Sequence, residues 1–406
     1  MTSRLKICLP LLGAASLVLV FTHVAAAQAP ETAPPSTAAT AGTAASATPA
    51  GTATVPPVVP AAAPIWSVGG LDFSGYIDAY YSYNGNRPSN SANGQVNDLY
   101  NFNDKTDQFN LSAAKLTVNH DPDPVGVHVD LIYGRTNALI HSASEQTTDN
   151  YIEQAYISTK PPKAHGTEID IGQFVTSAGA EVIESMSNWN YSRSLLFTYA
   201  IPYYHFGVRT STPVTKVWAA GVQLVNGWNN VVSNNAGVTL GLTSAVTTPK
   251  VTWSANVYTG PSNSDTQKGY RNLFDSTVLL TPTAKFNAYL NYDYGQNRAP
   301  QATGTGMSSL HWQGIAGAAR DQITSKSALA GRLEYYEDQG FQTGVSQHVK
   351  EFTGTYEYKW LAGLLMRAEV RHDWSDQTFF HNGDTGMVKA QTTATLAFIA
   401  FFGPRR

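Results

Sequence analysis

Polar and apolar residues alternate with a period of two over most of the chain. In residues 285–294, Phe286 and Leu290 fall on one side of the alternation, whereas Asn291 and Asp293 fall on the other. Successive side chains of a β-strand point to opposite faces of the sheet. The pattern therefore predicts strands with one apolar and one polar face.

The same alternation recurs along the sequence and predicts sixteen strands. Their ranges are 71–84, 109–121, 126–135, 150–159, 167–174, 206–212, 217–226, 237–246, 250–259, 271–281, 284–296, 309–319, 326–338, 349–359, 363–374 and 389–402. An even strand number is typical of bacterial outer-membrane barrels.

The predicted connections alternate between short turns and long loops. Short turns fall at residues 121–124, 213–216 and 282–283, whereas long loops cover 85–108 and 175–205. Outer-membrane barrels have short periplasmic turns and long external loops. We therefore expect an all-β fold: a transmembrane antiparallel up-and-down barrel of about sixteen strands, wide enough for an aqueous channel.

Composition narrows the function classes. The chain has 406 residues, of which 42% are hydrophobic and only 14% are charged, with a formal net charge of -3. It lacks the basic excess that binds phosphates, so we expect no nucleic-acid partner. Beyond the N-terminal region no apolar run reaches 18 residues, which argues against an inner-membrane helical protein.

The N-terminal region carries export signals. Arg4 and Lys6 precede an apolar stretch at residues 11–21, and small residues at 25–27 fit a signal-peptidase site. We expect residues 1–27 to be a signal peptide. Residues 28–64 are rich in Ala, Pro and Thr and are expected to form a disordered periplasmic linker, and residues 65–406 to form the barrel. The single cysteine, Cys8, would leave with the signal peptide.

One block of sequence resembles the OmpL-like outer-membrane porin family, also described as β-barrel porin type 2. The residues that carry the resemblance are Gly172-Gln173-Phe174, Gly179, Glu181-Val182-Ile183-Glu184-Ser185, Asn190-Tyr191-Ser192-Arg193-Ser194, Ile201-Pro202 and His205-Phe206-Gly207-Val208-Arg209, preceded by Glu153-Gln154-Ala155-Tyr156. The resemblance implies a pore in the outer membrane of a Gram-negative-type bacterium, with membrane lipid and small hydrophilic solutes as partners.

The C-terminal strand departs from the usual barrel pattern. Barrels of this kind end on an aromatic residue that the barrel-assembly machinery reads, but here Phe402 is followed by Gly403-Pro404-Arg405-Arg406. We expect Phe402 to serve as this signal.

The long loop at residues 175–205 is the candidate pore constriction. If it folds into the lumen, it brings Glu181, Glu184, Arg193 and, on the following strand, Arg209 close to passing solutes. Alternatively, the loop packs against the wall with Arg193 paired to a barrel carboxylate.

The alternation also places charged residues on the lumen face. These are Asp78, Lys115, Asp130, Asp293, Arg332, Glu334, Glu357, Arg367, Glu369 and Arg371. They line a polar pore or form cross-strand ion pairs that stiffen the wall. The histidines lack metal-ligand spacing and no catalytic motif is present, so we expect no enzyme, metal or cofactor.

Two main hypotheses for function follow. The first is a porin, a water-filled diffusion channel narrowed by the 175–205 loop. The second is a non-conducting outer-membrane barrel that acts in adhesion or surface binding. A soluble carbohydrate-binding β protein is a third hypothesis, which fractionation with outer membranes would test.

Overall fold

The computed structural model describes residues 66–89, 95–141, 151–233, 235, 237–261, 268–300 and 306–403. By its internal contacts the chain divides into residues 1–47 and residues 48–406. All described residues belong to the second unit. The expected signal peptide at 1–27 and linker at 28–64 lie outside the described residues.

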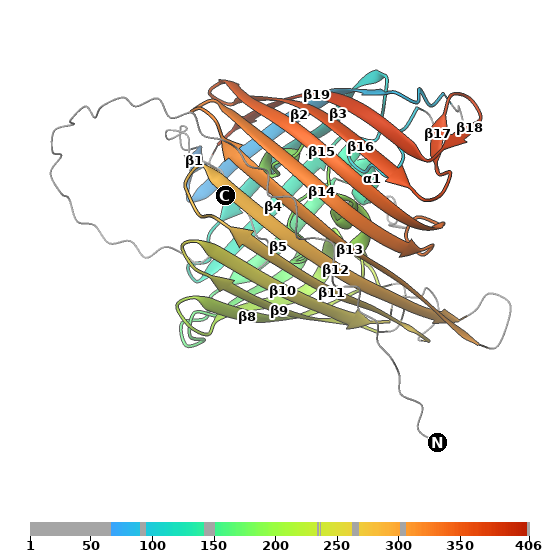
Figure 1. The fold of residues 1–406 in the computed structure, drawn as a ribbon. Helices are drawn as coiled ribbons and strands as arrows, with labels where there is room; N and C mark the ends of the chain where they lie inside the picture. Colours follow the sequence, from blue (N-terminus) through green and yellow to red (C-terminus); the bar gives the residue numbers. More distant parts are fainter. Residues whose placement is uncertain are drawn as a thin grey trace. The chain divides into compact units, whose positions relative to one another are not determined.

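Sixteen long antiparallel strands close into a barrel within the described part of the chain (Figure 1). They are β2 Leu71–Asn84, β3 Gln108–His120, β4 Val125–Tyr133, β5 Ile152–Thr159, β6 Glu168–Val175, β7 Tyr204–Pro213, β8 Trp218–Val225, β9 Thr239–Thr247, β10 Val251–Gly260, β11 Tyr270–Leu280, β12 Phe286–Pro300, β13 Met307–Gln322, β14 Ser327–Gln339, β15 Ser346–Leu361, β16 Leu364–Ser375 and β19 Ala390–Phe402. Each of these sixteen strands pairs with the next one in this list, so β16 pairs with β19. Strand β19 pairs with β2 to close the ring.

Short elements accompany the barrel. The two-residue strand β1 (Ser67–Val68) pairs with the start of β2. The hairpin β17 (Phe380–Asn382) and β18 (Gly386–Val388) lies between β16 and β19, and helix α1 (Arg135–Ile140) follows β4. No helix of the described residues is long and apolar enough to cross a membrane.

The predicted fold is confirmed: all sixteen predicted strands are present, with ends that move by a few residues. The largest local difference is at 126–135, where β4 ends at Tyr133 and α1 begins at Arg135. Gly134 between them has a φ of 116°, a conformation that interrupts a strand and favours glycine. The Arg135 guanidinium then pairs with Asp104 of the loop between β2 and β3.

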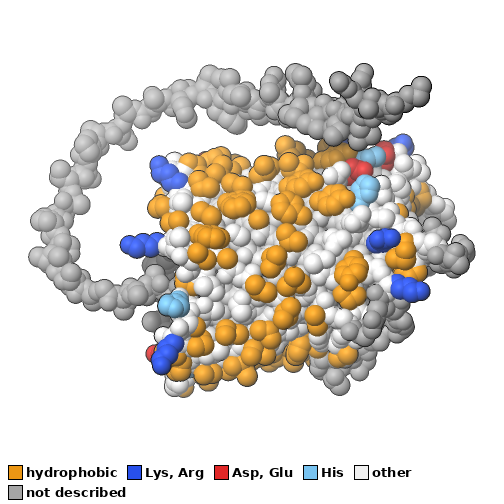
Figure 2. Space-filling model, turned by 90° about the horizontal axis from the view of Figure 1, so that it is seen from below, with side chains coloured by type: hydrophobic (Ala, Val, Ile, Leu, Met, Phe, Trp, Pro, Cys, Tyr) orange, Lys and Arg blue, Asp and Glu red, His pale blue; other side chains and the backbone are white. Residues whose placement is uncertain are grey.

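The two faces of the wall differ in polarity as the alternation predicts. On β2, Ile77 is 57% exposed on the outside, whereas its neighbour Asp78 is 1% exposed and faces inward. On β16, Val370 and Arg371 show the same contrast. Figure 2 shows hydrophobic side chains spread over the outer surface of the strands. An apolar outer band with a polar interior suits a barrel whose surroundings are lipid.

Candidate functional site

The segment between β6 and β7, residues 176–203, contains the candidate site. It includes the short helices η1 (Ser185–Ser187) and η2 (Leu196–Ala200). Its first residues cross to the wall at β8, β10 and β11. The Gly179 amide donates to Asp275 Oδ1 at 2.9 Å, and the Asn256 amide group donates to the Ser177 carbonyl at 3.0 Å.

Gly179 is required at this crossing for two reasons. Its φ is 93°, which other residues rarely adopt. In addition, a Cβ at this position would lie 2.6 Å from Cδ1 of Ile201, near the end of the same segment. Another residue at this position would be strained by the positive φ and would displace the end of the Ile201 side chain.

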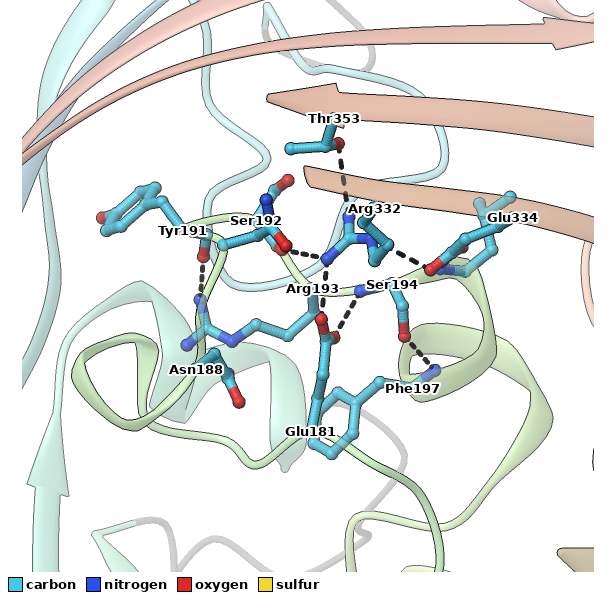
Figure 3. A network of polar contacts seen from close by, with 12 residues as sticks. Glu181, Asn188, Tyr191, Ser192, Arg193, Ser194, Phe197, Arg332, Glu334 and Thr353 are labelled. Atoms are coloured by element: carbon cyan, nitrogen blue, oxygen red, sulfur yellow. Dashed lines mark hydrogen bonds and ion pairs between the residues drawn. The ribbon is translucent and has the colours of Figure 1, made fainter. Parts of the chain in front are cut away.

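A buried ion-pair network joins the middle of the segment to β14 and β15 (Figure 3). Glu181 Oε1 lies 2.7 Å from Arg332 Nη1, and Arg332 also pairs with Glu334 and Glu351 at 3.0 and 3.1 Å. The other Glu181 oxygen accepts a hydrogen bond from the Ser194 amide at 2.6 Å. The network thus ties two parts of the segment to each other and to the wall.

Charged side chains of strand β16 bind backbone groups of the segment. Glu369 accepts hydrogen bonds from the amides of Tyr191 and Ser192 at 2.5 and 2.9 Å. Arg371 donates to the Arg193 carbonyl at 2.8 Å, and Arg367 donates to the Asn188 carbonyl at 2.6 Å.

Strands β2 and β3 complete the polar contacts. Asp78 accepts hydrogen bonds from the Ser185 hydroxyl at 2.5 Å and from the Tyr191 hydroxyl at 2.9 Å. Burial, together with the Asp78 carboxylate, raises the pKa of the Tyr191 phenol well above its usual value, so the phenol keeps its proton and can donate it. On β3, Lys115 forms an ion pair with Glu184.

The last third of the segment is mainly apolar and buried. Leu195, Leu196 and Phe197 are buried in one cluster with inward-facing aromatic residues such as Trp312 of β13. The Trp312 indole donates to the Ala200 carbonyl at 3.0 Å. Polar anchors therefore hold the first two thirds of the segment, and dispersion contacts hold the rest.

Two of the four predicted constriction residues are the arginines Arg193 and Arg209. Arg193 contacts the backbone of the segment itself, and Arg209 contacts strand β6, where the segment begins. Arg193 donates to the Tyr191 carbonyl at 2.8 Å and lies 4.9 Å from the Phe102 ring centre, so it has backbone and aromatic partners in place of the barrel carboxylate considered from sequence. Arg209 of β7 pairs with Asp170 at 2.7 Å, at the root of the segment.

Glu181 and Glu184 differ in accessibility. Glu181 is almost completely buried in the Arg332 network. The Glu184 side chain is 19% exposed, and both glutamates border a cavity of about 340 Å³ that is also lined by Lys115, Arg320 and Arg367. Of the predicted constriction residues, Glu184 is therefore the one best placed to meet a solute.

The structure places the ten predicted lumen residues on the inward face, where all are at most 9% exposed. Glu357 pairs with both Arg320 and Arg367, and Asp293 lies directly opposite Asp275 on the neighbouring strand. The sequence leaves open whether these residues line a polar pore or form cross-strand ion pairs. In the structure the 176–203 segment and neighbouring side chains cover them.

Several participating residues were absent from the predicted set. These are Glu153, Asp275, Arg320, Glu351 and Asp373, all inward-facing and buried. Asp275, Arg320, Glu351 and Asp373 occupy the polar side of the same alternation, so a systematic reading of every strand would have found them. Glu153 would not be found in this way, because it and its neighbour Gln154 are both buried where the register between β4 and β5 shifts.

Comparison with known proteins decides the family. The family model described as "Putative beta-barrel porin-2, OmpL-like" matches residues 70–402. The chain belongs to this family. The protein is thus an OmpL-like outer-membrane porin, in agreement with the resemblance seen in the sequence, and its family and fold are those of channels. No curated protein matches its sequence.

Solved porin structures share the fold of this OmpL-like porin. The outer-membrane channel DcaP of Acinetobacter baumannii aligns with a TM-score of 0.56 and 12% identity, over 83% of this chain and 99% of that chain. OmpF of Salmonella typhi, in complex with daunomycin, gives 0.55 and 14%, over 82% and 97%. The anion-selective porin of Comamonas acidovorans gives 0.53 and 10%, over 82% and 99%.

Proposed function

We propose that this porin is a diffusion channel for small hydrophilic solutes and that residues 176–203 constrict its lumen. The observation that carries the proposal is the reach of this one segment, which bonds to Asp275 on β11 and to Glu369 on β16. A segment that joins distant parts of the inner wall limits the size of the opening. The charges that border the opening then set its ion preference.

We assign different roles to the four predicted constriction residues. Glu184, next to Lys115 and the cavity, acts on passing ions. Glu181 and Arg193 hold the segment in shape through their buried contacts, and Arg209 braces its root against Asp170. Inward-facing charges such as Arg367 and Glu357 complete the polar wall beside the cavity.

Conductance of the purified porin in planar bilayers tests the proposal. Replacing residues 182–198 with a short Gly-Ser linker should raise the single-channel conductance. Glu184→Lys should shift the reversal potential in a salt gradient toward anions, and Glu184→Gln should shift it less. Unchanged conductance in a folded linker variant would contradict the constriction role.

Burial of the lumen residues favours a second candidate function, a non-conducting barrel that binds an external partner. Leu195, Leu196 and Phe197 are at most 3% exposed, and Arg332 is 1% exposed. If wild-type protein conducts nothing and the linker variant conducts, residues 176–203 act as a plug. Absence of conductance in both would favour the binding function.

We also propose that the assembly machinery reads Phe402. This side chain lies on the last strand, is 42% exposed and packs against Trp66 with ring centres 5.4 Å apart. Phe402→Ser should lower the yield of heat-modifiable barrel in outer membranes more than Phe398→Ser does on the same face.

A further inference from the structure

Four charged side chains meet where the segment approaches β3, β4 and β5. The Lys115 ammonium lies 2.8 Å from Asp130 Oδ2 and 2.6 Å from Glu153 Oε2, and it also contacts Glu184 of the segment. Three of these side chains belong to adjacent strands of the wall. Glu184 alone comes from the segment, so this cluster is a junction between the two.

Acidic groups outnumber basic groups in this cluster. Three carboxyl groups face a single ammonium, and His128 lies 3.1 Å from Asp130. The Glu153 side chain is completely buried, and among the described residues its Oε1 atom has no hydrogen-bond partner. Buried charges are normally paired or coordinate a metal. Glu153 therefore contributes a buried carboxyl oxygen without a hydrogen-bond partner.

The carboxylate spacing suits a hard cation. One oxygen each from Asp130, Glu153 and Glu184 can be chosen so that all three lie within 4.8 Å of one another. Calcium binds oxygen ligands at about 2.3–2.6 Å, so its ligands lie up to about 5 Å apart. Hydrogen bonds from Thr117 and Gln154 orient the Asp130 carboxylate, as outer hydrogen bonds orient metal ligands.

The neighbouring cavity supplies access. It has a volume of about 340 Å³ and is lined by Lys115, Asp130 and Glu184. Water molecules can complete the coordination of a cation from this side, and the flexible Lys115 stem can withdraw into the same space.

We propose that Asp130, Glu153 and Glu184 form a binding site for a divalent cation, calcium or magnesium, which exchanges with the Lys115 ammonium. The cation joins Glu184 of the segment to Glu153 and Asp130 of the wall. Binding fastens the segment at this junction, where a divalent cation brings one more positive charge than the lysine does. The inference concerns ion binding and holds whether or not the barrel conducts.

Terbium luminescence and thermal unfolding of the full porin in detergent test the proposal. Tyr76 lines the same cavity and can sensitise bound terbium. We expect terbium emission that calcium displaces, and a melting temperature that rises and saturates with added calcium relative to EDTA. Glu153→Gln should weaken binding roughly tenfold or more. Glu168→Gln, which alters a carboxylate paired with Lys160, should leave it unchanged.

A lysine variant separates the cation site from a plain ion-pair cluster. In Lys115→Met the ammonium that competes with calcium is gone, so calcium should bind more tightly than in the wild type. In EDTA the melting temperature of this variant should be lower than that of the wild type, and added calcium should restore it. Addition of Glu153→Gln to this variant should abolish the calcium response. Equal calcium responses in wild type and Glu153→Gln, or none in wild type, would overturn the proposal. So would a Lys115→Met protein that calcium does not stabilise.

Discussion

Glu181 in the segment between β6 and β7 forms a buried ion pair with Arg332 of β14, with 2.7 Å between Oε1 and Nη1. The same guanidinium also pairs with Glu334 and Glu351. One arginine on the wall therefore contacts three carboxylates and positions the segment.

Loss of this arginine should be costly. Arg332→Met keeps much of the side-chain volume but leaves Glu181, Glu334 and Glu351 without their shared cation. Removal of one partner from a buried pair costs about 3–5 kcal/mol. Urea unfolding in lipid vesicles should show a loss of this size, whereas Lys326→Met at an exposed turn should change stability by less than about 0.5 kcal/mol. Similar effects of both substitutions would contradict a structural role for the network.

Charge on the outer face should destabilise the barrel in the membrane. Val370 is about half exposed on the lipid-facing side of β16. Val370→Arg should cost about 2–4 kcal/mol if this position lies near the bilayer midplane. Val214→Arg, in the turn after β7, serves as the control because it lies outside the strands. The comparison uses unfolding in vesicles, and equal costs would show that the assigned face or depth is wrong.

Glu369 should control docking of the segment. Its two oxygens accept the Tyr191 and Ser192 amides, so Glu369→Arg removes both acceptors and adds a cation beside Arg371. We expect greater protease cleavage within residues 176–203 and a higher conductance than in wild type. Glu369→Gln, which retains one acceptor, should have a smaller effect. A Glu369→Arg protein with wild-type cleavage and conductance would show that these bonds do not hold the segment.

Gly179 should tolerate substitution poorly. Gly179→Ala forces a residue with a Cβ to adopt a φ of 93° and to contact Ile201. A strained left-handed residue costs about 1–3 kcal/mol. At Gly354 the closest atom to an added Cβ is 3.8 Å away and φ is not positive, so Gly354→Ala should be neutral or slightly stabilising. Thermal unfolding of both variants checks the difference.

The sequence by itself determined the barrel and the two faces of its wall. The alternation of Leu290 with Asn291 and of Val370 with Arg371 is local, because a strand directs successive side chains to opposite sides wherever it lies in the sheet. The strand number and the approximate strand positions follow from such local patterns, and the family resemblance around residues 172–209 follows from local motifs.

Only the tertiary structure decided which inward-facing groups meet. Glu181 pairs with Arg332, and Glu184 with Lys115, across long separations in the chain. Such partners depend on ring closure and on the path of residues 176–203, and no local period encodes either of them. The same path covers inward-facing residues such as Arg371, for which the alternation leaves a polar pore and cross-strand ion pairs as alternatives. Alternation specifies the face of a side chain, whereas its partner and its exposure depend on what packs against that face.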